Sequence, residues 1–330
     1  MKHMQFGRTG LKVSRLCLGT MTFGLQCDEA TSRAIMDRAF DAGIDFFDTA
    51  DAYPLGSGLE LAGRTEEVIG RWMQGRRQSV VIATKAAARV GDRAWDEGNS
   101  RKHLLDAIDA SLARLGTDYV DLYQLHWDDG ITPLDESLEA LDTIVRSGRA
   151  RYVGVSNFAA WRLAKMLGRA DLLEVARPVS IQPRYSLLFR QFERDLFPLA
   201  QEEGLAVIPY NPLAGGMLTG KYRPGMQPQE GTRFTLGNAG ARYQERYWHE
   251  RELAVSATFA ELAQQHGVVP ARAAIAWVLA NPAVTSVIIG ASQPAQLADS
   301  IAAADVVLAP ELAARLDALT REFRYGDAVR

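Results

Sequence analysis

Residues 120–155 read VDLYQLHWDDGITPLDESLEALDTIVRSGRARYVGV and contain one strand–helix–strand unit. Residues 120–125 and 152–155 are short, mostly apolar runs, as expected for strands buried in a sheet. Between them, residues 134–147 carry apolar side chains at the i, i+3, i+4 spacing of an amphipathic helix. A helix that connects two such strands predicts that the strands are parallel.

The same unit repeats along all 330 residues. Helical spacing returns over residues 31–42, 101–115 and 159–169. Eight strands are predicted, over residues 16–20, 45–48, 80–84, 120–125, 152–155, 180–182, 206–209 and 286–289. Eight βα units close naturally into a (β/α)8 barrel, and an open doubly wound sheet is the alternative. The spacing is even, with no composition break or linker, which favours the barrel and one domain over residues 1–330.

Three segments lie outside the repeat. Residues 4–13 contain a Gly-Arg-Thr-Gly turn and predict a small hairpin before the first barrel strand. Residues 224 to about 250 form a long insertion after the seventh strand, and long loops of this kind are usually functional or mobile. Residues 310–323 predict one extra helix that packs on the outside.

Bulk composition excludes several classes of protein. The net charge is −3, so no general field attracts nucleic acid or an anionic membrane. Only Cys17 and Cys27 occur, without the spacing of a disulfide framework or a metal site. The polar N-terminus does not resemble a signal peptide, and no apolar run reaches the ~20 residues of a membrane span. We expect a soluble, cytoplasmic protein that acts on a small molecule without a metal; its oligomeric state does not follow from the sequence.

Catalytic groups of a (β/α)8 barrel gather where the strands end, on the loops that follow. Asp48 ends the second predicted strand and Tyr53 follows five residues later, while Lys85 follows the third strand and His126 the fourth. Each residue alone has an ordinary structural explanation, such as a surface charge, a packed ring or a cap. Four such groups on one rim are different, because burying them together without a function would cost free energy.

These four side chains suit one kind of chemistry. A phenol with a pKa near ~10 is a weak acid at neutral pH, and a neighbouring ammonium lowers that pKa. A carboxylate would hold the ammonium in place, and an imidazole could orient a carbonyl oxygen by a hydrogen bond. Such a set can protonate a carbonyl while hydride arrives from a cofactor.

Asp48, Tyr53, Lys85 and His126 resemble the catalytic tetrad of the aldo-keto reductase family, in the same order and near the usual spacing. The likeness covers essentially the whole chain, including GRTGLKVS at the start, GVSNF at 154–158 and YNPLAGGMLTGKY at 210–222. The last segment is most similar to the bacterial and potassium-channel-β-like branches. The resemblance implies a barrel oxidoreductase that interconverts aldehydes or ketones with alcohols, with Tyr53 as general acid and base.

The resemblance also implies where a nicotinamide cofactor binds. The residues matching the family's cofactor contacts are Thr20, Met21, Asp48, Ser156, Asn157, Gln182, Tyr210, Asn211, Pro212, Leu213, Ala214, Gly215, Lys221, Arg233, Gly290, Ser292 and Gln296. Tyr210 would stack on the nicotinamide, and Lys221 and Arg233 would lie near the phosphates, which favours NADP(H). Gln293 and Ser300 depart from the family pattern of Arg and Asn, so NAD(H) stays open.

The substrate itself is not identified by the sequence. Phe23, Tyr53, His126 and Trp127 are the residues expected to shape its pocket. One alternative is a cofactor-binding regulatory protein with little turnover, as in the channel-β relatives, although the histidine at 126 favours an enzyme. The other is a different barrel enzyme, such as a lyase or a hydrolase.

Overall fold

The computed structural model describes residues 1–325 and contains a sheet of eight parallel strands. Its strands are β3 (Leu16–Gly19), β4 (Phe46–Asp48), β5 (Val81–Ala86), β6 (Val120–Leu125), β7 (Ala150–Ser156), β8 (Ser180–Gln182), β9 (Ala206–Val207) and β10 (Val287–Ile289). They pair in chain order from β3 to β9, and β10 pairs with β3 on the other side. All eight predicted strands are present, with ends that differ by no more than a few residues.

Backbone contacts between β9 and β10 close the sheet into a barrel. The N–H of Thr285 donates to the carbonyl of Val207 at 2.8 Å, and that of Ile288 donates to Pro209 at 2.9 Å. Val207 also forms a parallel bridge with Val284. Because both edges of the sheet meet, the fold is the predicted (β/α)8 barrel and not an open, doubly wound sheet.

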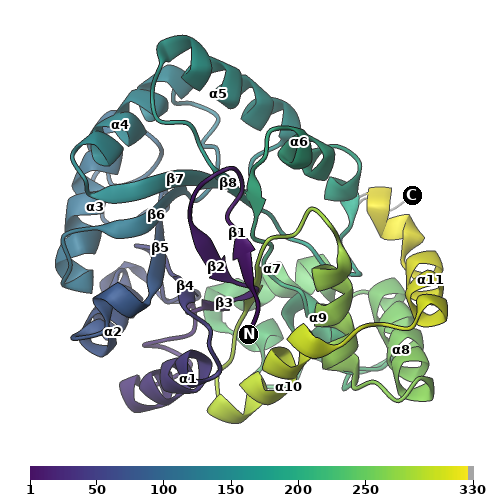
Figure 1. Ribbon diagram of the computed structural model, residues 1–330. Coiled ribbons are helices and arrows are strands. Elements are labelled where there is room, and N and C mark those ends of the chain that lie inside the picture. Colours follow the sequence, from purple (N-terminus) through teal and green to yellow (C-terminus); the bar gives the residue numbers. More distant parts are fainter. Residues whose placement is uncertain (326–330) are drawn as a thin grey trace.

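Helices surround the barrel, as the ring of ribbons in Figure 1 shows. They are α1 (Glu29–Asp41), α2 (Arg64–Met73), α3 (Arg101–Leu115), α4 (Leu134–Arg146), α5 (Ala160–Leu173), α6 (Leu196–Glu202), α9 (Pro270–Ala280) and α10 (Leu297–Ala302). In α3, the Ser100 hydroxyl caps the first turn by accepting from the His103 N–H, and Gly116 ends the helix at a φ of 63°. Leu104 and Ile108 of α3 are fully buried, which stabilises the packing by about 1.5–3 kcal/mol each.

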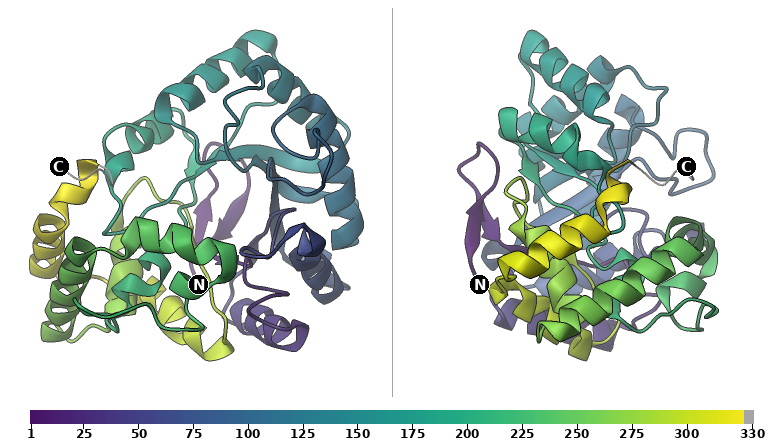
Figure 2. Two further views of the ribbon diagram at one scale, coloured as in Figure 1. Left: turned by 180° about the vertical axis from the view of Figure 1, so that it is seen from behind. Right: turned by 90° about the vertical axis from the view of Figure 1, so that its right-hand side faces the viewer.

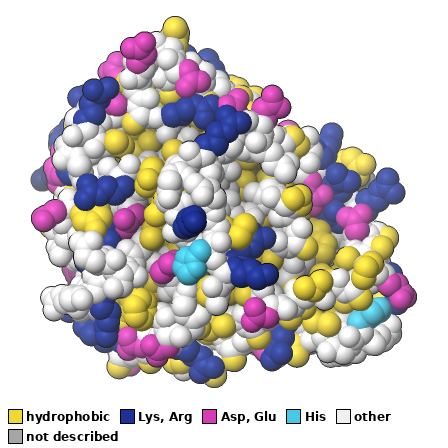
Figure 3. All heavy atoms as spheres, viewed as in Figure 1, with side chains coloured by type: hydrophobic (Ala, Val, Ile, Leu, Met, Phe, Trp, Pro, Cys, Tyr) yellow, Lys and Arg dark blue, Asp and Glu magenta, His cyan; other side chains and the backbone are white. Residues whose placement is uncertain are grey.

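The predicted hairpin covers one end of the barrel. It consists of β1 (His3–Gln5) and β2 (Lys12–Ser14), and it lies in front of the barrel in Figure 1. Phe6 follows β1, is fully buried, and packs edge-on against Phe46 with ring centroids 5.8 Å apart. On this face Lys and Arg side chains are interspersed with Asp and Glu (Figure 3). The hairpin closes the amino-terminal end, so a site at the barrel must open at the opposite end.

The insertion after the seventh barrel strand contains a helix, whereas the sequence analysis expected a long loop. This helix, α7 (Gly237–Tyr247), is followed by α8 (Glu250–Gln265), and it lies behind the barrel in Figure 1 and in front of it in the left view of Figure 2. A Cβ on Gly237 would lie 2.6 Å from the carbonyl oxygen of Gly56, in the loop after β4. The start of α7 therefore packs against a loop at the carboxyl ends of the strands.

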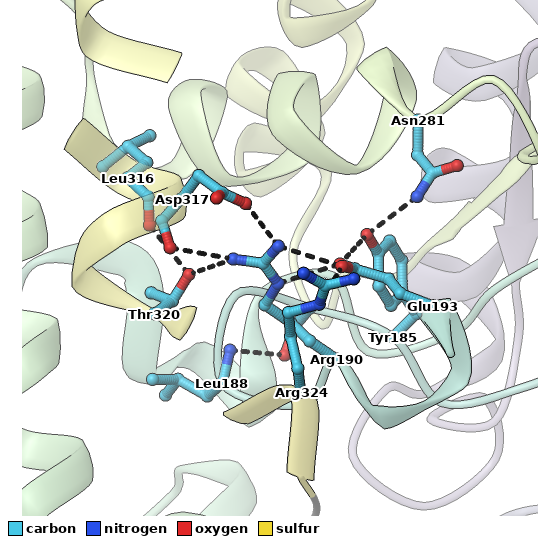
Figure 4. A network of polar contacts seen from close by, with 10 residues as sticks. Tyr185, Leu188, Arg190, Glu193, Asn281, Leu316, Asp317, Thr320 and Arg324 are labelled. Carbon is cyan, nitrogen blue, oxygen red and sulfur yellow. Dashed lines mark hydrogen bonds and ion pairs between the residues drawn. The ribbon is translucent and has the colours of Figure 1, made fainter. Parts of the chain in front are cut away.

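The expected extra helix, α11 (Pro310–Leu319), ends in a 3₁₀ turn over Arg321–Tyr325. Arg190, in the segment after β8, forms hydrogen bonds and an ion pair with this C-terminal part of the chain (Figure 4). Its guanidinium bonds to Glu193 at 2.8 and 2.9 Å, to Asp317 at 2.5 Å and to the Thr320 hydroxyl at 2.9 Å. None of the helices within residues 1–325 has the length and apolar character needed to cross a membrane.

Candidate active site

A buried ion pair lies at the centre of the candidate site. Lys85, near the end of β5, places its Nζ 2.5 Å from Asp48 Oδ1 and 2.7 Å from the carbonyl of Thr49. Burial is the largest single effect and lowers the pKa of Lys85, but Asp48, by its charge and its hydrogen bond, and Tyr53 together outweigh burial and raise it. Lys85 is therefore a fixed positive charge. Two of its three N–H groups are occupied, which leaves one for a further acceptor.

Tyr53 lies directly against this pair. The Nζ of Lys85 is 5.2 Å from the centre of the Tyr53 ring. The loop is held by the Asp51 N–H, which donates to the carbonyl of Lys85 at 3.0 Å, and by the Tyr53 N–H, which donates to Ala50 at 3.2 Å. Burial raises the pKa of Tyr53 to about 12, against the opposing effect of Lys85. The lysine acts in the expected direction, but burial is the larger effect and the expected net lowering is absent.

His126 completes the cluster from the next strand. Its ring centre lies 5.8 Å from that of Tyr53, edge to face, and 5.1 Å from that of Trp127. Burial, followed by the charges of Lys85 and Arg242, lowers the pKa of His126 well below its usual range. The imidazole is therefore neutral at pH 7, and its Nδ1 is buried without a hydrogen-bond partner in the described chain. A neutral ring can donate one N–H to a carbonyl oxygen.

Polar residues of the next strands form a connected layer beside the cluster. Gln182 donates to Asp48 Oδ2 at 2.8 Å and its carbonyl accepts from the Ser156 hydroxyl at 2.8 Å. Asn157 is exposed, and its Oδ1 accepts from the Tyr210 hydroxyl at 2.8 Å. Ser156 and Gln182 are 1% and 3% exposed, so their side chains are buried beneath the site. Asn157 and the half-buried Tyr210 lie nearer to solvent, at the mouth of the barrel.

The backbone is strained where the strands end. Within residues 1–325, five residues other than glycine have a positive φ, and Ala87, Asn157, Asn211 and Ala214 of these follow β5, β7 or β9. Each such conformation costs of order 1–3 kcal/mol and persists where the surrounding structure enforces it, often at functional sites. The segment with Asn211, Pro212, Leu213, Ala214 and Gly215 is therefore held in a defined shape at the barrel mouth.

Of the basic residues expected near the phosphates, Lys221 lies just before the insertion and Arg233 lies within it. Lys221 is exposed, whereas Arg233 is half-buried and has a buried Nη1 without a hydrogen-bond partner in the described chain. The charge of Arg233 lowers the pKa of Cys27, against the larger effect of burial, and Cys27 Sγ lies 3.5 Å from the carbonyl of Ser292. Arg233 is therefore within electrostatic range of Cys27, which contacts the segment with Gly290, Ser292 and Gln296.

Two expected residues of the first loop take structural roles. The Thr20 N–H and hydroxyl both donate to the carbonyl of Asp48, at 3.1 and 2.9 Å, and the Thr20 side chain is fully buried. Phe23 is also fully buried and packs in the core outside the barrel, so its side chain does not line the mouth as expected. Met21 is half-buried and Trp127 is 38% exposed, so both can contact a ligand.

These donors fit a phosphorylated dinucleotide. Arg233 Nη1 and Asn211 Nδ2 are buried donors without partners within the described residues, and such groups are costly unless a ligand accepts from them. Gly216 has a φ of 103° and open space where a Cβ would be, so the backbone there can be approached closely. Arginine is well suited to phosphate because its planar fork makes two parallel hydrogen bonds.

Comparison with known proteins shows the family to which this chain belongs. The sequence model of the aldo/keto reductase family matches residues 15–321. The chain belongs to the aldo/keto reductase family. It is 43% identical over 323 residues to an uncharacterised oxidoreductase of Bacillus subtilis, covering 94% of each chain. It is 37% identical over 309 residues to L-glyceraldehyde 3-phosphate reductase of Escherichia coli, covering 92% of this chain and 87% of the relative. It is 36% identical over 309 residues to a probable voltage-gated potassium channel subunit beta of Arabidopsis thaliana, covering 93% and 92%.

Membership of the aldo/keto reductase family makes the protein an oxidoreductase with a nicotinamide cofactor. The structure also shows polar residues that sequence reasoning did not single out. Gln124 of β6 donates to Asp48 Oδ2 at 3.1 Å, and its place two residues before His126, on the same face, was the available signal. Asn99 donates to the carbonyl of Trp127 at 2.8 Å. Tyr243 of α7 donates to Asn211 Oδ1 at 3.4 Å.

Proposed function

We propose that this protein is an NADP(H)-dependent reductase that converts an aldehyde or ketone to an alcohol, with Tyr53 as the proton donor. The observation that carries the proposal is the contact of the buried Lys85–Asp48 pair with Tyr53, with the neutral His126 ring 5.8 Å from the phenol ring. The bound cofactor supplies a hydride to the carbonyl carbon. The chain must then bind the carbonyl oxygen and give it a proton.

Each of the four side chains has a defined part in that proton transfer. His126 is neutral and donates a ring N–H to the carbonyl oxygen, which orients it toward Tyr53. Tyr53 gives its hydroxyl proton to the same oxygen. The phenolate that remains is stabilised by the Lys85 ammonium, which Asp48 holds in place. A proton from solvent restores the phenol, and in the reverse direction the phenolate is the base.

The cofactor assignment has its own support. Within the described residues, Arg233 has a buried nitrogen without a hydrogen-bond partner, and its charge acts on Cys27 beside the Ser292 segment; Lys221 lies just before the insertion. Two cationic side chains in this region favour a 2′-phosphate and hence NADP(H) over NAD(H). Asn157, Tyr210 and the strained backbone at Asn211 would hold the rest of the cofactor at the mouth.

A cofactor-monitored assay tests the function. We expect the purified protein to consume NADPH with a range of aldehydes, and Tyr53→Phe to abolish most of this turnover while keeping cofactor binding. Tyr185→Phe is a matched control, because this tyrosine also makes buried hydrogen bonds but bonds to Glu193 and Asn281 away from the cluster. Tight NADPH binding without turnover on any carbonyl would instead indicate a regulatory protein on the same fold.

A further inference from the structure

We propose that Arg242 and Arg246 form an anion subsite at the barrel mouth, and that the carbonyl substrate carries a phosphate or carboxylate group. This inference rests on the proposed reductase function and adds the chemical class of the substrate. Both arginines belong to α7, the helix of the insertion, and they are one helical turn apart, so they are neighbours on its surface.

Packing around Tyr243 fixes α7 at the mouth. Tyr243 is 3% exposed and its hydroxyl lies 3.4 Å from Asn211 Oδ1. A Cβ on Gly215 would lie 2.8 Å from the Tyr243 ring, so the loop after β9 and α7 are in close contact. Leu236 and Ala239 pack around Gly56, three residues after Tyr53 in the chain. The helix therefore bridges the Tyr53 loop and the loop after β9, and the residues beside Tyr243 flank the mouth.

Both arginines act on residues of the candidate site. Arg246 lies close enough to Tyr210 for its charge to oppose the burial that raises the pKa of Tyr210. The charge of Arg242 reaches His126, where it adds to burial in lowering the pKa of the ring. Arg242 itself is exposed. The charge of Arg242 therefore reaches a group bound beside His126, and the charge of Arg246 reaches the mouth of the barrel at Tyr210.

These charges lack acidic partners. Neither Arg242 nor Arg246 forms an ion pair with an Asp or Glu among residues 1–325, whereas Arg251, the next arginine in the chain, pairs with Glu252 at 2.5 Å. Like charges one turn apart repel each other and destabilise a helix. Bound phosphate or carboxylate would remove that repulsion and accept hydrogen bonds from the planar guanidinium groups.

Two other basic residues, Lys221 just before the insertion and Arg233 within it, are assigned to the phosphates of the cofactor. The charge of Arg233 acts on Cys27, whereas those of Arg242 and Arg246 act on His126 and Tyr210. The Arg233 guanidinium also lies 5.5 Å from the centre of the Tyr243 ring, so it is close to α7 as well. The two groups therefore differ in the site residues that they act on, and a binding measurement with NADPH must separate their roles.

The experiment compares matched substrates. The ratio of kcat/KM is measured for glyceraldehyde 3-phosphate over glyceraldehyde, and for succinic semialdehyde over butanal, with saturating NADPH. We expect the parent to prefer the anionic member of at least one pair, and the pair that shows the preference identifies phosphate or carboxylate. Arg242→Met and Arg246→Met should each lower that ratio about tenfold, mainly through KM. Arg242→Lys, which keeps the charge, should lose less.

Two controls separate this inference from its rivals. Arg315→Met removes the same charge from α11 and should leave the ratio unchanged. The dissociation constant of NADPH, from quenching of tryptophan fluorescence, shows whether the arginines bind the cofactor instead. Equal losses for charged and uncharged aldehydes, no anionic preference, or a selective loss of NADPH affinity would each overturn the subsite. If no carbonyl is reduced by the parent, the proposed function itself fails.

Discussion

Lys85 Nζ lies 2.5 Å from Asp48 Oδ1, and the two side chains are only 0% and 4% exposed. A buried pair of this kind stabilises the fold weakly, because desolvation offsets most of the attraction. The main role of the pair is therefore to place a fixed positive charge next to the Tyr53 ring.

The first prediction concerns that proton donor. Tyr53→Phe keeps the ring but removes the acidic proton, so single-turnover reduction at saturating NADPH should fall by ~10²–10⁴-fold. Lys85→Met should cause a similar loss, and the double variant should be no worse than the poorer single variant, because both residues serve one proton transfer. A melting curve must show that each variant is folded. A Tyr53→Phe enzyme within about threefold of the parent would contradict the tetrad assignment, since general acid catalysis is worth far more.

The second prediction concerns the ionisation of Tyr53 in the cofactor-free protein. Burial raises its pKa to about 12, so the phenol should stay protonated through pH 10. A difference titration of ultraviolet absorbance, parent minus Tyr53→Phe, should show no phenolate from this residue below about pH 11. Ionisation near pH 8 would show that the Lys85 charge outweighs burial.

The third prediction concerns stability toward acid. The pKa of His126 is depressed in the folded state, so its contribution to stability is present above the unfolded pKa of about 6.5 and is lost as pH falls toward the folded value. The melting temperature of the parent should therefore fall more steeply between pH 6.5 and pH 5 than that of His126→Gln. Parallel curves for the two proteins would refute this. His103→Gln is a useful comparison, because burial also lowers the pKa of that ring, far from the tetrad on α3.

The fourth prediction concerns cofactor choice. If Arg233 binds the 2′-phosphate, Arg233→Ala should weaken NADPH binding by about 1.5–3 kcal/mol and scarcely affect NADH. Arg223→Ala is the matched control, since Arg223 is exposed just before the insertion and its guanidinium bonds, within the described residues, to the carbonyls of Gly220 and Tyr222. Calorimetric titration with both cofactors measures the effect. Equal losses for NADPH and NADH would mean that Arg233 does not distinguish them.

The fifth prediction concerns the network in Figure 4. Arg190 is 3% exposed and binds Glu193, itself 12% exposed. Arg190→Met leaves a buried carboxylate without its main partner and should destabilise the protein by about 3 kcal/mol. Adding Glu193→Gln should restore part of the loss, because it removes a mostly buried carboxylate that keeps only Arg324, at 3.1 Å, as an ion-pair partner. Denaturant unfolding measures the free energy of unfolding of the single and the double variant. If the double variant is as unstable as Arg190→Met or less stable, the loss does not come from the Glu193 carboxylate.

The regular parts of the fold could be predicted closely from the sequence. The helix expected over residues 101–115 has those bounds in the structure, because a serine cap, an apolar stripe and a glycine stop all mark it. The helix α7 was missed, since Gly237 and Gly240 and a run of polar residues hide its pattern. Ala239, Tyr243 and Tyr247, spaced four apart and buried, were the signal.

The sequence indicates which side chains lie close together in the candidate site, but not how deeply they are buried or how their pKa values shift. Chain order places Asp48, Tyr53, Lys85 and His126 at strand ends, and the structure brings them together. Burial cannot be read from spacing, so the raised pKa of Tyr53 and the full burial of Phe23 emerged only from packing. Arg242 and Arg246 act on the site through α7, whose position depends on contacts with Gly56 and Gly215.

The junction of β9 with β10 has a consequence for how the protein is made. The N–H groups of Thr285 and Ile288 complete the barrel by bonding to Val207 and Pro209, and β10 also pairs with β3 near the start of the chain. During synthesis, the sheet therefore has two open edges until residue 289 has left the ribosome. Open edges can pair with strands of other chains. Closure requires contacts between distant parts of the sequence, and such contacts form slowly. Both edges of the sheet therefore stay open until residues 287–289 have left the ribosome and can pair.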